Sequence, residues 1–167
     1  ELHKEEYSGR KIGGVWINGK PKIILNADNI GSDRIKPIIV HELRHALDDL
    51  KSKGKASSST RYSTPKKKEH RKNDPYSGKN YPYLAKPEEI NARFAQVLDG
   101  LVDSISKNSN MRPDQLWDQE IKVLKRLLSA YDISSLFPER EKSKDYKRLI
   151  KRAVDFIQKE IKYIQSV

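Results

Sequence analysis

Residues 51–80 constrain the fold most, because this stretch contains almost no large aliphatic side chain. It is rich in Lys, Ser, Thr, Gly and Pro, and it carries ten Lys or Arg against two acids. A segment of this composition buries too little apolar surface to form a core, so it predicts a solvated, mobile loop. The core must therefore be built from residues on both sides of it.

The whole chain has 167 residues, of which 35% are hydrophobic, enough for one modest core. Most of its net charge of +11 lies in residues 51–80, and so in a loop and not on a folded face. A basic loop suits an acidic protein or a nucleic acid. The contact candidates in it are Lys66, Lys67, Lys68, Arg71 and Lys72.

The amino-acid composition excludes several kinds of site and protein. The chain has no cysteine, which excludes disulfides, thiolate catalysis and Cys-ligated zinc. No apolar run reaches the roughly 18 residues of a membrane span, and no signal peptide is visible, so we expect a soluble protein of unknown compartment. Because the sequence begins at Glu1 and its only methionine is Met111, we expect a fragment or processed part of a larger polypeptide.

The first elements expected are a hairpin and a helix. Asn18-Gly19 stands between two β-prone runs, 15–17 and 23–25, and favours a tight hairpin turn, while Pro21 favours an edge strand. Apolar residues spaced by three and four then predict a helix that begins between Ser32 and Lys36 and ends between Leu50 and Lys53. Its predicted stripe is Ile35, Ile38, Ile39, Leu43, Ala46, Leu47 and Leu50.

Three further helices are expected after residue 86. Pro87, followed by two acids, favours a helix start, and the apolar spacing continues to Leu101. After a polar break at 107–110, the same spacing predicts helices over 113–131 and from 143 to about 164. Strands followed by helices indicate an α+β fold class.

The segment "VHELRHALDD", residues 40–49, carries the strongest chemical signal. On a helix, His41 and His45 project from one face, so their ring nitrogens can converge on one ion. Glu42 stands one position round, within reach of a water on that ion. This is the H-E-x-x-H pattern of zinc metalloproteases, in which the glutamate is the general base. The alternative is a solvated helix face.

A catalytic zinc ion normally takes a third protein ligand and keeps one position for water. The third histidine of the metzincin pattern would fall at Lys51, so that extension is absent. His70 lies within the basic loop and His3 near the terminus, where solvated side chains are the simpler interpretation. A carboxylate on another helix remains, and the candidates are Glu88 and Glu89.

"HELRHALDD" resembles the active-site helix of metalloproteases of the anthrax lethal factor type, including its alanine and the paired acids Asp48 and Asp49. In that family the third ligand is a glutamate on a later helix, followed by two residues and then an alanine. The segment "EINA" at 89–92 is similar. The resemblance covers about twenty residues. It implies a gluzincin with Zn²⁺ on His41, His45 and Glu89, and with Glu42 as base.

The resemblance further implies a zincin-like fold and a zinc-dependent endopeptidase with protein or peptide substrates. Residues 1–106 would then form the catalytic domain, with the hairpin packed on the active-site helix and the basic loop as an insertion. Residues 107–167 would form a helical C-terminal subdomain on the same core. The strand around 23–26 is a candidate edge for binding an extended substrate.

Other side chains are candidates for supporting roles. The resemblance gives Tyr81 or Tyr83 as the donor to the oxyanion, although either tyrosine can simply anchor the loop. Asp48 and Asp49 are candidates for orienting a zinc-bound histidine, or are solvated acids near a helix end. Arg93, one turn after Glu89, either braces that carboxylate or faces solvent.

A different class of function is also open. The basic segment 51–80, with Tyr62, Tyr76 and Tyr81 in or next to it, would attract a phosphate backbone. The chain would then be a nucleic-acid-binding module or a catalytically inactive zincin-like domain. A chain that binds no zinc would exclude the peptidase. Because an inactive zincin-like domain also binds zinc, the activity of a Glu42 variant must be tested as well.

Overall fold

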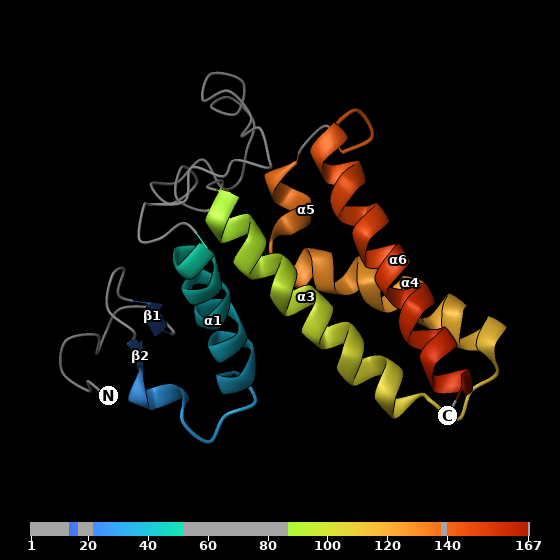
Figure 1. Cartoon of the computed structure of the whole chain (residues 1–167), viewed down its shortest axis with the longest axis horizontal. Coiled ribbons are helices and arrows are strands. Elements are labelled where there is room, and N and C mark those ends of the chain that lie inside the picture. The colour runs from blue at the N-terminus through green and yellow to red at the C-terminus, as the bar shows by residue number, and fades with distance from the viewer. Residues whose placement is uncertain (1–13, 17–21, 52–86, 138–139, 167) are drawn as a thin grey trace.

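The computed structural model describes residues 14–16, 22–51, 87–137 and 140–166 (Figure 1). Most of these residues are helical. The elements, in chain order, are β1 (Gly14–Trp16), β2 (Ile23–Leu25), a short 3-10 helix (Ala27–Asn29), α1 (Ile35–Lys51), α3 (Pro87–Lys107), α4 (Pro113–Ala130), α5 (Ile133–Leu136) and α6 (Lys144–Ser166). Among the described helices, none is long and apolar enough to cross a membrane.

The hairpin expected around residues 15–25 is present. Strands β1 and β2 pair antiparallel, with Gly14 opposite Leu25 and Val15 opposite Ile24. The predicted turn at Asn18-Gly19 and the following Pro21 lie outside the described residues. The inward side chain of β2 is Ile24, which is buried. A small sheet followed by helices agrees with an α+β order.

Helix α1 begins and ends within the predicted limits, but its buried face differs from the predicted stripe. Leu43, Leu47 and Leu50 are 48%, 49% and 70% exposed, whereas the buried residues of the helix are Glu42 and Ala46. Apolar spacing identifies a helix, but the packing partners decide which face is covered. Here the face toward the neighbouring elements is the one that carries the H-E-x-x-H motif.

The hydrophobic core lies among the last four helices. Helices α3, α4 and α6 contribute buried side chains at the predicted spacing of three and four residues. The short helix α5, which was not predicted, also contributes buried side chains. The core also joins α3, which precedes the expected domain boundary at residue 106, with the helices that follow it. The buried members include Ile90, Phe94, Val97, Leu101, Leu116, Leu124, Leu128, Ile133, Leu149, Ala153 and Ile157.

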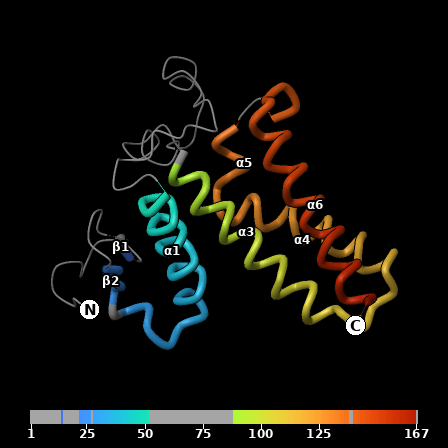
Figure 2. Tube along the Cα trace, in the orientation of Figure 1, coloured from blue at the N-terminus to red at the C-terminus, as the bar shows by residue number. Residues whose placement is uncertain are grey.

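Helix α3 lies between the two parts of the molecule (Figure 2). One side of it contacts α1, which in turn contacts the hairpin, and its other contacts are with α4, α5 and α6. Elements that are far apart in sequence, α1 and α3, are thus direct neighbours. This neighbourhood brings the two predicted sources of metal ligands together.

Candidate metal centre

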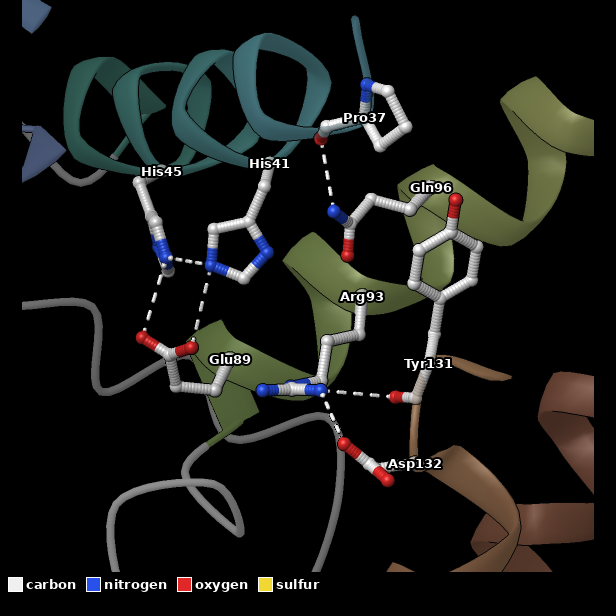
Figure 3. Close-up of polar contacts among 8 residues, drawn as sticks. All are labelled: Pro37, His41, His45, Glu89, Arg93, Gln96, Tyr131 and Asp132. Carbon is white, nitrogen blue, oxygen red and sulfur yellow. Dashed lines mark hydrogen bonds and ion pairs between the residues drawn. The ribbon is translucent and has the colours of Figure 1, made fainter. Parts of the chain in front are cut away.

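The two histidines project from one face of α1 toward the first turn of α3, where Glu89 lies (Figure 3). The Nε2 atoms of His41 and His45 are 3.0 Å apart. Glu89 Oε2 lies 3.3 Å from Nε2 of His41, and Oε1 lies 3.2 Å from Nε2 of His45. The carboxylate therefore spans both rings.

Burial distinguishes this cluster from a solvated surface. The side chain of Glu89 is only 4% exposed, and those of His41 and His45 are 16% and 14% exposed. A carboxylate taken this far out of water needs a cation or several hydrogen bonds to offset its desolvation. The solvated helix face considered from the sequence is therefore not what α1 presents here.

The donor set fits a zinc ion. One ligand atom each from His41, His45 and Glu89 lies within 4.8 Å of the others, and within the described residues this is the group that meets that criterion. In a tetrahedron with zinc–ligand bonds of about 2.1 Å, neighbouring ligand atoms are about 3.4 Å apart. The closest separations observed, 3.0–3.3 Å, are near this value. Two imidazoles and a carboxylate are also the ligands of known catalytic zinc sites.

Glu88 and Glu89, which the sequence left as alternatives, are separated by the fold. Glu89 is buried and lies against both histidines, whereas Glu88 is half-buried and does not belong to the donor group. Successive residues on a helix point about 100° apart, so only one of two adjacent acids can face α1.

Electrostatics at His45 reflect the nearby acids. Burial lowers the pKa of His45, but the hydrogen bond and charge of Glu89, with the charges of Glu42 and Glu88, raise it above the usual value overall. Negative charge around the imidazoles is also what attracts a divalent cation.

Glu42 is buried, with 6% of its surface exposed, and follows His41 directly on α1. Strand β1 approaches it closely at Gly14. A Cβ atom at Gly14 would lie 3.2 Å from Glu42 Cγ and 3.1 Å from both Ile38 Cγ2 and Leu25 Cδ2. A side chain at Gly14 would require these neighbours to move by a few tenths of an ångström, so the glycine lets β1 pack closely against the Glu42 side chain. No pattern in the sequence predicts this contact.

The candidates for supporting roles have different environments. Asp48 forms an ion pair with Arg44 on the same helix, with 2.9 Å between Oδ1 and Nη2. Asp49 is half-buried on the last turns of α1. Tyr81 and Tyr83 lie outside the described residues, as do Lys66, Lys67, Lys68, Arg71 and Lys72.

Arg93 ties the ligand-bearing helix to the turn after α4. Its Nη1 donates to the carbonyl oxygen of Tyr131 and to Asp132 Oδ2, at 3.1 Å in both cases (Figure 3). Asp132 has a left-handed backbone with φ 60°, which Asp tolerates better than most residues. Arg93 was predicted either to brace Glu89 or to face solvent. Its side chain is only 19% exposed, so it does not face solvent. Its role as a brace for Glu89 stays a prediction.

Comparisons of the chain with protein-family models, with curated proteins and with solved structures yield no match.

Proposed function

We propose that the chain is a zinc-dependent endopeptidase of the gluzincin type with a zincin-like fold. The observation that carries the proposal is the meeting of His41 and His45 from α1 with Glu89 from α3, in a buried cluster whose spacing suits a metal ion. The adjacent Glu42 supplies the further group that hydrolysis needs.

The metal would be held by one nitrogen from each histidine and by the Glu89 carboxylate. A zinc ion in this position supplies an acidified water and polarises the carbonyl of the scissile peptide. His41 and His45 would each hold it through one ring nitrogen, and Glu89 would contribute the negative charge that favours a divalent cation.

Glu42 does the proton transfers. Its carboxylate accepts a proton from the attacking water and returns it to the nitrogen of the leaving amine, so that one residue acts first as base and then as acid. Its burial beside β1 restricts the carboxylate to few conformations, which favours a reproducible geometry for these transfers.

The hairpin offers a place for the substrate main chain. An extended peptide can add to the open edge of a small sheet, where backbone hydrogen bonds supply affinity. The close approach of Gly14 to the Glu42 side chain, which puts strand β1 near the proposed base, supports such a binding mode. The substrate class is therefore a polypeptide in extended conformation.

The test compares purified wild-type protein with two variants. Glu42→Gln should retain stoichiometric zinc by elemental analysis but lose hydrolysis of an unfolded protein substrate by at least about 100-fold, as expected for the loss of a general base. His41→Ala should lose both. Wild-type protein that binds no zinc, or unchanged turnover in Glu42→Gln, would disprove the assignment.

A further inference from the structure

Helix α3 has two chemically different sides. The side toward α4, α5 and α6 carries large buried apolar residues such as Phe94 and Leu101. The side toward α1 carries Glu89, Gln96 and a pair of aspartates. The two parts of the molecule are therefore attached to α3 by different kinds of interaction.

Polar contacts join α1 and α3 at several points along the two helices. Besides the histidines and Glu89, Gln96 Nε2 donates to the carbonyl oxygen of Pro37 at 2.8 Å. At the start of α1, Lys36 Nζ lies 2.7 Å from Asp103 and 3.2 Å from Asp99. Lys36 is half exposed, and exposed ion pairs contribute little to stability.

Among the described residues of α1 and β2, few apolar side chains are fully buried. No residue of α1 or of the hairpin belongs to the described hydrophobic core, which is confined to α3 and the later helices. The buried apolar residues of α1 and β2 are Ala46 and Ile24, and the leucines of α1 face outward. Because hydrophobic stabilisation follows buried apolar area, α1 contributes less to the described hydrophobic core than the later helices do.

We infer that the metal ion holds α1 and the hairpin against the helical body formed by α3–α6. The inference rests on the metal site of the proposed function, but not on peptide hydrolysis. An ion shared by His41, His45 and Glu89 joins the two helices at a buried carboxylate that faces both imidazoles. Without it, α1 separates from α3 in a local opening while the body stays folded.

Hydrogen–deuterium exchange of the full chain, with zinc and with a chelator, tests the inference. At zinc about 100 times its Kd, an opening that releases the ion becomes about 100-fold rarer, and amides of α1 should exchange more slowly by this factor. In the chelated protein, amides of α4 and α6 should stay protected while those of α1 exchange, because the helical body remains folded. His45→Ala should show the fast exchange of α1 even in zinc.

Gln96→Ala is the matched control, because it removes a polar contact between the same two helices without touching the ligands. With zinc bound, its α1 should stay protected. The inference is disproved if zinc binds and α1 is unaffected, if α1 is as well protected as α4 and α6 in the chelated protein, or if Gln96→Ala exposes α1 to exchange despite bound zinc. Failure to bind zinc would disprove the metal site itself. A protein that binds zinc and protects α1 but hydrolyses no peptide would disprove only the peptidase activity.

Discussion

Replacement of Glu89 by Gln should separate the two acids that open α3. Glu89→Gln keeps the shape of a side chain that is 4% exposed but removes the charge that faces both histidines. Glu88→Gln makes the same chemical change one position earlier, at a half-buried residue outside the donor group. The pair of variants therefore compares ligand loss with a matched loss of one nearby charge.

The size of the effect follows from linkage. Loss of a residue that hydrogen-bonds to a metal ligand weakens metal binding by about 10–100-fold. Loss of a direct ligand should therefore weaken zinc binding by at least the upper value. Zinc at about 100 times the wild-type Kd stabilises the fold by about 2.7 kcal/mol, but after a 100-fold loss of affinity by only about 0.4 kcal/mol. The difference of about 2.3 kcal/mol lowers Tm by about 5–9 °C in a chain of this size.

Thermal melts with matched zinc and chelator samples measure this effect. Glu89→Gln should lose nearly all of the zinc-dependent rise in Tm, and Glu88→Gln should keep most of it. An equal loss in both variants would mean that general negative charge, and not a bond from Glu89, holds the ion. An unchanged zinc response in Glu89→Gln would remove Glu89 from the ligand set.

Three further predictions concern the surroundings of the site. Gly14→Ala should cost about 1–3 kcal/mol of stability in urea unfolding and reduce turnover with zinc content unchanged, because the new methyl group crowds Glu42; normal activity would argue against the hairpin as part of the site. Arg93→Ala should destabilise the chain by about 2 kcal/mol, since Asp132 and the turn after α4 lose a charged donor, and a change below about 0.5 kcal/mol would contradict this. In the metal-free protein, the raised pKa of His45 makes a stabilising contribution that is complete below the unfolded pKa of about 6.5 and is lost as pH rises through the folded value. The fall in Tm from pH 6 to pH 8 should therefore be smaller in His45→Gln than in the chelated wild type.

Much of the secondary structure was predictable, because local signals determine it. Apolar spacing and two helix-starting prolines placed the long helices to within a few residues, and the hairpin was predicted from its β-prone runs and their turn signal. The four-residue α5 was missed, since Ile133 and Leu136 give too short a pattern to distinguish from a loop. Which face of α1 is buried was also not predictable, because it depends on α3 and the hairpin, and not on α1 alone.

The metal ligands were predictable to different degrees. His41 and His45 follow from their spacing within one helix, which any helical segment must place on one face. Glu89 required knowledge of a second helix and of a short resemblance, and only the packing of α1 on α3 separates it from Glu88. The approach of Gly14 and the bond from Gln96 to Pro37 depend on tertiary packing, for which single residues give no sequence signal.

The distance in sequence between the two ligand-bearing helices has a consequence for the free energy of assembling the site. His45 and Glu89 are joined by about forty residues, and each doubling of such a connection adds only about 0.6 kcal/mol to the entropy cost of bringing its ends together. That cost is small beside the loss expected for one direct ligand. The chain entropy lost when the two ligand-bearing helices come together is therefore a minor term beside the free energy that the ligands contribute.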